Sequence, residues 1–380
     1  MLKRWGTILI CFLSLGLLAL VVKHFPMPQS FEELNQGISY KDILPDTGHT
    51  EEFYNESYYH NGWFDDGSVV YIQFIFHNIG IGSFHPSADL TIITPDNKVH
   101  HFTEDYPDKN LEIARERFEV KFGEHLLKGD PEKQHYRVRV WFDQLGADLE
   151  YFCETPGLLD PGLYYNDNPK DFQRWVTYCL KARVEGQLKV GDKLWKVRGR
   201  GFADHAKSQI AYTNLKNGFQ LYQRAGNEGI SVSLMENRWV ENGKKFRLPN
   251  LQVALEDKIV FFSRDDYQLD ILGLGTSPGG KKFPNKFYLY AKNDWFELEA
   301  NFEMERFLLE GGLFDRLGKV FGGILAHLFN HPGYYRYLSR FEYKYHFHYQ
   351  GEEKSGKGKT WTVSQVIYSG SPDFEIWKEK

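Results

Sequence analysis

The sequence predicts an all-β protein with two domains. Its 380 residues exceed what one hydrophobic core usually organises, so length favours two domains over one. Aromatic residues make up 16% of the chain, with 30 Phe, 23 Tyr and 9 Trp, and they suit half-buried strand surfaces better than helix interiors. Short strand-like segments separated by turn residues recur in both halves, which is typical of barrels and sandwiches.

The N-terminus combines positive charge with an apolar stretch. Lys3 and Arg4 precede the segment from Gly6 to Val22, which has no charged residue. Its length lies between a signal-peptide core and a short spanning helix, and the preceding charges place the body of the chain across the membrane. We therefore expect an apolar helix in residues 1–24 and a tether in residues 25–50. The helix is a signal anchor with the body on the periplasmic or extracellular side, or a signal peptide whose cleavage yields a secreted protein.

Two cysteines lie outside that segment. Cys153 and Cys179 would form a disulfide in an oxidising compartment, and otherwise they are two buried thiols.

Alternation identifies the clearest strands. In His135 to Phe142, apolar residues alternate with mostly basic ones, as expected when one sheet face is buried. The segment Arg340 to Gln350 places five aromatic residues on one face, an aromatic strip of Phe341, Tyr343, Tyr345, Phe347 and Tyr349. The strip is either ordinary core or the wall of a cavity for a long apolar molecule.

One segment of the second half has helical periodicity. Apolar residues between Leu309 and His331 predict an amphipathic helix, although several glycines weaken it. Such a helix would pack against a sheet, cover a barrel mouth as a lid, or dip into the membrane.

An expected strand near the middle of the chain contains a motif of two glycines followed by an aspartate and a histidine. Residues 193–209 read KLWKVRGRGFADHAKSQ, in which Gly199-x-Gly201 precedes Asp204-His205. Two glycines permit close backbone approach, and the adjacent Asp and His can offer a carboxylate and an imidazole to one cavity. The third glycine and the βαβ context of a dinucleotide site are missing.

This motif, together with YHNGWFDDG at residues 59–67, resembles the tandem lipocalin-like superfamily, which includes carotenoid hydratases (hydroxyneurosporene synthases), survival-factor-type lipid carriers and decalin-forming Diels-Alderases. The resemblance spans about Glu51 to Ser369. It implies two lipocalin-like (calycin-type) antiparallel barrels, in residues 51–192 and 193–372. Hydratase-type members usually continue with Asn-Trp-Gly after Asp-His, where this chain has Ala206-Lys207-Ser208.

The same resemblance implies candidate site residues. For acid-catalysed addition of water to an alkene, or isomerisation of a polyene, Asp204 would donate the proton from a buried position and His205 would orient it or manage water. Phe202 and the aromatic strip would line the ligand cavity. The alternative is that Asp204 and His205 bond neighbouring backbone and hold the two barrels in register.

These observations predict binding or transport of an apolar lipid or isoprenoid-like ligand at the membrane surface. One alternative is a hydratase or isomerase that uses Asp204 as its general acid, and the other is an envelope interaction module without a ligand.

No cofactor, metal or nucleic acid is expected. The pair His327 and His331 lacks the glutamate of a metalloprotease motif, and His346 and His348 lack a third ligand. With 46 Lys and Arg against 51 Asp and Glu, a net charge of −5 leaves no basic excess to neutralise phosphates.

Overall fold

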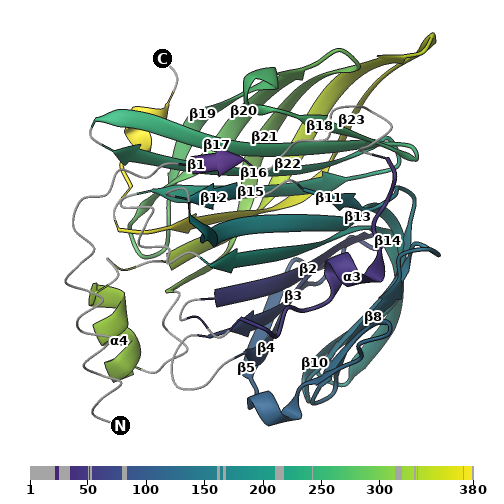
Figure 1. The fold of residues 1–380 in the computed structure, drawn as a ribbon, viewed down its shortest axis with the longest axis vertical. Coiled ribbons are helices and arrows are strands. Elements are labelled where there is room, and N and C mark those ends of the chain that lie inside the picture. The colour runs from purple at the N-terminus through teal and green to yellow at the C-terminus, as the bar shows by residue number, and fades with distance from the viewer. Residues whose placement is uncertain are drawn as a thin grey trace.

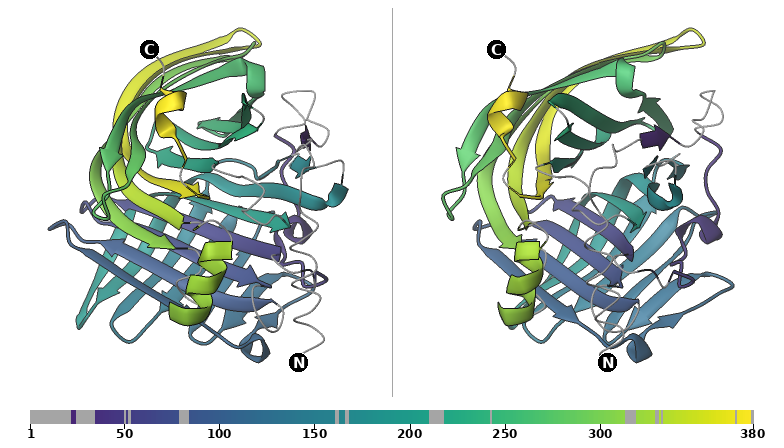
Figure 2. Two further views of the ribbon diagram at one scale, coloured as in Figure 1. Left: turned by 90° about the vertical axis from the view of Figure 1, so that its left-hand side faces the viewer. Right: turned by 60° about the vertical axis from the view of Figure 1, so that its left-hand side comes forward.

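The computed structural model describes residues 22–24, 35–49, 51, 54–78, 84–160, 163–165, 168–209, 218–241, 243–312, 319–328, 331, 333–370 and 372–378. These residues form two curled antiparallel sheets that follow one another along the chain (Figures 1 and 2). The predicted all-β fold with two tandem barrel-like sheets is confirmed.

The first sheet has 14 strands, with the main order β5-β4-β3-β2-β14-β13-β10-β9-β8-β7-β6. We call it the first barrel. Its strands are β1 (Val22–His24), β2 (Tyr54–Phe64), β3 (Val69–His77), β4 (His85–Ile93), β5 (Val99–Asp105), β6 (Glu112–Ile113), β7 (Phe118–Phe122), β8 (His125–Asp130), β9 (His135–Trp141), β10 (Leu145–Cys153), β11 (Leu158–Leu159), β12 (Leu163–Tyr165), β13 (Asn168–Val190) and β14 (Lys193–Gln209). Two short helices, α3 (Tyr40–Ile43) and η1 (Asp108–Asn110), accompany it.

The second sheet has nine strands, in the order β18-β17-β16-β15-β23-β22-β21-β20-β19. We call it the second barrel. Its strands are β15 (Phe219–Gly226), β16 (Ile230–Glu241), β17 (Lys244–Leu255), β18 (Lys258–Phe262), β19 (Tyr267–Thr276), β20 (Lys282–Lys292), β21 (Phe296–Gly312), β22 (Gly333–Tyr349) and β23 (Glu352–Tyr368), with helices η3 (Arg264–Asp266), α4 (Lys319–Leu328) and η5 (Phe374–Trp377). Strands β22 and β23 meet at Gln350 and Gly351, whose φ angles of 49° and 82° suit a tight hairpin turn.

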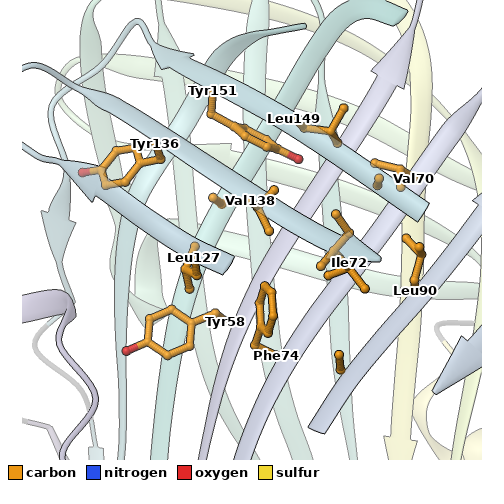
Figure 3. Packing of buried hydrophobic residues seen from close by; sticks show 14 of the residues in the cluster. Tyr58, Val70, Ile72, Phe74, Leu90, Leu127, Tyr136, Val138, Leu149 and Tyr151 are labelled. Carbon is orange, nitrogen blue, oxygen red and sulfur yellow. The ribbon is translucent and has the colours of Figure 1, made fainter. Parts of the chain in front are cut away.

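Each barrel encloses its own apolar core. In the first barrel, Tyr58 and Phe74 of the neighbouring strands β2 and β3 lie in the same core as Val138 of β9, which comes from another part of the curled sheet (Figure 3). These three side chains are 0%, 1% and 0% exposed. A side chain that lines an open cavity retains accessible surface, so the space around these residues is filled.

A third buried layer lies between the outer faces of the two sheets. We call this layer the junction. Its apolar members come from both barrels and are Tyr59, Trp63, Val69, Tyr71, Ile93, Leu158, Leu180, Phe202, Ala254, Ile259, Leu338 and Val363 in one cluster, and Trp175, Tyr222, Met235, Trp239, Leu248 and Ile367 in another. The inner face of each sheet therefore lines its own core, while part of its outer face covers the other sheet.

The domain boundaries differ from those predicted. Strand β14 pairs with β13 and β2, so it completes the first barrel, and the boundary lies between Gln209 and Phe219 rather than at residues 192 and 193. The two-residue connection from β13 to β14 is a hairpin turn, which favours pairing within one sheet.

The predicted tether is also wrong for residues 35–49. These residues include α3, and Ile43 is 0% exposed in the first core. Residues 1–21 of the expected apolar helix lie outside the described residues, and Val22–His24 pair with β12. Across the described ranges, no helix has the length and apolar character needed to span a membrane.

The expected amphipathic helix is present in shorter form. Helix α4 covers Lys319–Leu328, whereas residues 309–312 continue strand β21. That extension pairs with the start of β22, where Gly312 lies opposite Gly333. In α4, Ile324 is 55% exposed.

Cys153 and Cys179 form a disulfide between the end of β10 and the middle of β13, with their Cα atoms 5.4 Å apart. Both residues are buried in the first core. The disulfide therefore constrains β13 next to two breaks in its register with β14.

Replacing both cysteines by alanine should lower the free energy of unfolding. The residues are separated by 26 positions, and chain entropy for such a loop gives a loss of about 3.5 kcal/mol. Urea titration of the variant and the wild type with and without a reductant measures the loss. Reductant should destabilise only the wild type, and equal stability of all four samples would contradict the prediction.

Candidate functional site

The two residues of the central motif point to different interiors. Asp204 lies opposite Tyr59 across the β14–β2 ladder, and His205 lies opposite Tyr58. Tyr59 belongs to the junction, whereas Tyr58 belongs to the first core. Because neighbouring strand residues face opposite sides of a sheet, one cavity cannot receive both side chains. The expectation that Asp204 and His205 serve one cavity is therefore wrong.

Asp204 forms an ion pair that crosses the junction. Its Oδ2 accepts hydrogen bonds from Nε and Nη2 of Arg224 on β15, at 3.1 and 2.7 Å. Both residues are 3% exposed. The guanidinium carbon of Arg224 lies 4.6 Å from the ring centre of Tyr59, 5.0 Å from that of Tyr222 and 5.3 Å from that of Phe202.

This arrangement changes the chemistry open to Asp204. Burial raises its pKa above the usual range, while the charge and hydrogen bonds of Arg224 oppose the rise. The aromatic faces around Asp204 already bind the Arg224 cation. A carbocation formed about 4 Å from that charge would be repelled by about 4 kcal/mol at an effective dielectric constant of 20. The site therefore suits an ionised anchor between the sheets better than an acid that protonates alkenes.

A second arginine repeats the arrangement. Arg336 of β22 is 2% exposed and donates from Nη1 to Asp89 at 3.3 Å and to Thr91 at 3.2 Å. Its guanidinium lies 3.7 Å from the ring centre of Tyr71, and Tyr71 donates to Gln365 at 2.8 Å. Two arginines of the second barrel thus reach into the outer face of the first.

Several buried polar atoms of the junction have no hydrogen-bond partner within the described part of the chain. They include Oδ1 of Asp204, both amide atoms of Asn61, Nε of Arg336, the indole nitrogens of Trp63, Trp175 and Trp239, Oδ1 of Asn237 and Oε1 of Gln252. Asn61 pairs with Phe202 on β14, which makes it a diagonal neighbour of Asp204 on the same face. A buried unpaired polar group costs about 1–3 kcal/mol, and folded proteins usually satisfy such groups with ordered water or a ligand. The junction is therefore the candidate functional site.

His205 belongs to a separate polar group inside the first barrel. Its ring stacks on Tyr58 with centres 3.9 Å apart, and its Nε2 lies 3.4 Å from Oε2 of Glu56. The other oxygen of Glu56 accepts hydrogen bonds from the Tyr54 hydroxyl and the Asp46 amide and faces Lys207 at 3.7 Å. Burial lowers the pKa of His205 to about 4, although Glu56 opposes the shift. Burial alone would raise the pKa of Glu56, but His205, Lys207 and Tyr54 hold it below the usual range.

Comparison with solved structures decides the fold family. A Nitrosomonas europaea protein described as AttH matches with a TM-score of 0.62 and 12% identity, over 89% of this chain and 98% of that one. CghA matches with a TM-score of 0.62 and 12% identity, over 93% of this chain and 99% of CghA. Kievitone hydratase from Nectria haematococca matches with a TM-score of 0.56 and 9% identity, over 92% of this chain and 98% of the hydratase.

The chain has the tandem lipocalin-like fold. This confirms the resemblance drawn from the sequence motifs. No protein-family profile matches the sequence, and no curated protein does.

Within the tandem lipocalin-like fold, the aromatic strip packs into the second core. Phe341 and Phe347 are 0% exposed and Tyr343 is 7% exposed. The ring of Phe341 packs on Phe302 of the neighbouring strand β21, with centres 4.7 Å apart. Phe202 lies instead in the junction, beneath Arg224. The strip and Phe202 therefore do not share one cavity.

A pocket of about 340 Å³ opens at the end of the first barrel, lined by Thr47, Phe84, Asp108, Leu111, Ile113 and Arg115. Asp204 does not line it. The ring centres of His327 and His331, and those of His346 and His348, are both 5.8 Å apart. Within the described ranges, no three His, Cys, Asp or Glu side chains gather in a metal-binding group.

The sequence analysis missed Arg224, the partner of Asp204 in the junction, and Glu56, the neighbour of His205 in the first core. Arg224 stands in the strand FQLYQRAG, and Glu56 in the aromatic strand YNESYYH. The available signal was a charged residue within a strand of buried neighbours, which requires a partner. The identity of that partner depends on contacts between strands far apart in sequence.

Breaking the Asp204–Arg224 pair should destabilise the protein. Asp204→Asn and Arg224→Met should each cost about 3–5 kcal/mol, because each leaves the other group buried without its partner. The double variant should lose less than the sum of the two. Arg198→Met, at an exposed position of β14, is the control and should change stability by less than about 0.5 kcal/mol. Urea titrations complete the double-mutant cycle, and strictly additive losses would contradict the pairing.

Buried neutral histidines should make stability fall in acid. Burial lowers the pKa of His60 to about 3, and that of His125 and of His205 to about 4. Unfolded histidine binds a proton below pH 6.5 while these folded residues remain neutral, so stability should rise from pH 4.5 to pH 6. His60→Gln should reduce the slope by about 1.4 kcal/mol per pH unit in that window. Urea titrations across the window measure the slope, and His346→Gln is an exposed control. An unchanged slope in His60→Gln would show that His60 is not buried and neutral.

Proposed function

We propose that the protein binds an apolar small molecule of lipid or isoprenoid type, with its oxygen-bearing head group between the two barrels. The walls of the junction are aromatic and aliphatic, with Trp63, Trp175 and Trp239 among them. Ligand sites typically combine such walls with a few converging polar groups.

The observation that carries this proposal is the set of unpartnered polar atoms in the junction. Five donors are among them: the Asn61 amide nitrogen, Nε of Arg336 and three indole nitrogens have no partner among the described residues. Donors without partners favour a head group that accepts hydrogen bonds, such as a hydroxyl, carbonyl or carboxylate. Among proteins of similar fold, CghA has been solved with the compound Sch210972.

A hydratase or isomerase is the second candidate. It is favoured by Oδ1 of Asp204, which has no partner among the described residues, and by the upward shift of the Asp204 pKa, and kievitone hydratase has a similar fold. The adjacent Arg224 cation weighs against protonation of an alkene by Asp204. Binding therefore stands first.

We also propose that the protein acts beside a membrane, with its body outside the cytoplasm. The support is the basic and then apolar N-terminal segment, and the disulfide between Cys153 and Cys179, which suits an oxidising compartment. Protease added to intact cells, or to spheroplasts where an outer membrane is present, should digest the body. Digestion only after cell lysis would contradict this location.

Native mass spectrometry of the full chain in detergent, equilibrated with a membrane lipid extract, tests the binding proposal. The wild type should retain a lipid reproducibly. Asn61→Leu should weaken retention about tenfold without loss of stability, because it removes a buried unpaired amide and fills the space with an apolar side chain. Asn301→Leu, at an exposed position of β21, is the matched control.

Three outcomes separate the candidates. Equal retention by both variants and the wild type would remove the junction as the site. A ligand that the wild type alters chemically, and that Asp204→Asn binds unaltered, would make the protein an enzyme. Absence of any retained lipid would overturn the binding proposal and favour an interaction module.

A further inference from the structure

One end of the first barrel is closed by a short segment whose backbone is held by core side chains. We call residues 39–47 the lid. The Tyr58 hydroxyl donates to the carbonyl of Ile43 at 2.7 Å, and Lys207 donates to the carbonyl of Leu44 at 3.0 Å. The amide of Asp46 donates to Glu56 at 2.7 Å. The side chain of Ile43 fills core space at 0% exposure, and α3 lies beside the first barrel in Figure 1.

The side chains that hold the lid also surround His205. Tyr58 stacks on its ring, Glu56 faces its Nε2, and Lys207 follows two residues later on β14. Nδ1 of His205 is buried and has no hydrogen-bond partner among the residues described. Nε2 lies 3.4 Å from Oε2 of Glu56, but the two atoms are not aligned for a hydrogen bond. When an imidazole and a carboxylate lie close without a hydrogen bond, the binding of a ligand can shorten the distance and form that bond.

The pocket at the barrel end reaches the lid from outside. Thr47 lines this pocket and accepts a hydrogen bond from Arg115 at 3.0 Å. Phe84, on another wall, stacks on Tyr54 with ring centres 6.4 Å apart, and Tyr54 bonds Glu56. One layer of side chains therefore separates the pocket from the polar group around His205.

We propose that the lid covers a second ligand site, where His205 accepts a proton from a small planar molecule with an acidic hydroxyl group, such as an enol or an acidic phenol. The ligand would take the space that Ile43 leaves and stack beside Tyr58. Its O–H bond breaks, the proton moves to Nδ1 of His205, and Glu56 stabilises the imidazolium as the carboxylate of a catalytic triad does. The resulting ligand oxyanion pairs with this imidazolium.

The charges facing His205 fit this role. Glu56, Tyr54 and Tyr58 face it from β2, Lys207 from β14 and Asp46 from the lid. In the closed state burial holds the pKa of His205 at about 4, so the imidazole is neutral at pH 7 but a weak base. Opening the lid admits water, which removes the main cause of that shift and makes the imidazole a stronger base.

The first test measures lid opening in the full chain. Tyr58→Phe removes the hydrogen bond to Ile43, so hydrogen exchange of the Asp46 amide should become about tenfold faster. Tyr136→Phe makes the same change in the same core, at a side chain 1% exposed and outside the lid contacts, and should leave this amide unchanged. Lys207→Met, at a partly exposed position, removes the bond to Leu44 and should also speed exchange. Equal exchange in all variants would overturn the lid.

The second test uses 4-nitrophenol, a planar phenol whose ionised form absorbs visible light. The wild type should bind it and increase the nitrophenolate absorbance at pH 6, and Tyr58→Phe should bind it several-fold more tightly than Tyr136→Phe does. His205→Gln should abolish the absorbance increase. Persistence of that increase in His205→Gln, or no binding by the wild type and Tyr58→Phe, would overturn the site. Lipid retention at the junction is measured on the same variants, so failure of this site and failure of the junction are distinguishable.

Discussion

The alternation of side chains along β14 is the constraint on which the functional anatomy depends. It sends Asp204 into the junction and His205 into the first core, so two adjacent residues serve two interiors. Each then requires compensation within its own apolar surroundings. Arg224 of the second barrel compensates the charge of Asp204, and Glu56 of the first barrel lies beside His205. The two barrels are thereby joined through a charge that neither could bury alone.

The distribution of polarity follows from this constraint. The side chains of both cores and of the junction have little accessible surface, and the junction contains two arginines, several amides and three tryptophans whose indole nitrogens have no partner among the described residues. An apolar core contributes stability but offers few hydrogen bonds to the head group of a ligand. The junction has the mixture of apolar walls and unsatisfied donors that recognition of a ligand head group requires. At the lidded end of the first barrel, Oε2 of Glu56 and both ring nitrogens of His205 also have no hydrogen-bond partner among the described residues.

Much of the fold could be predicted from the sequence, because hydrophobic alternation reports which face of a strand is buried. The segment from Arg340 to Gln350 shows this well, since Phe341, Tyr343 and Phe347 are buried while Glu342 and Lys344 are exposed. Prediction failed where both faces are buried. Strand β14 packs in the core on one face and in the junction on the other, so its pattern gave no sign that it completes the first barrel. The partners Arg224 and Glu56 were out of reach because their contacts join strands distant along the chain.

The central claim is that the junction is a polar binding layer, held by Asp204 and Arg224 and open to further hydrogen bonds. A crystal structure of the full chain, at a resolution that locates ordered water, tests it most directly. The account predicts electron density for water or a ligand oxygen within hydrogen-bond distance of both Oδ1 of Asp204 and the amide of Asn61. A dry junction, in which other protein groups bond these atoms or Asp204 turns away from Arg224, would contradict it.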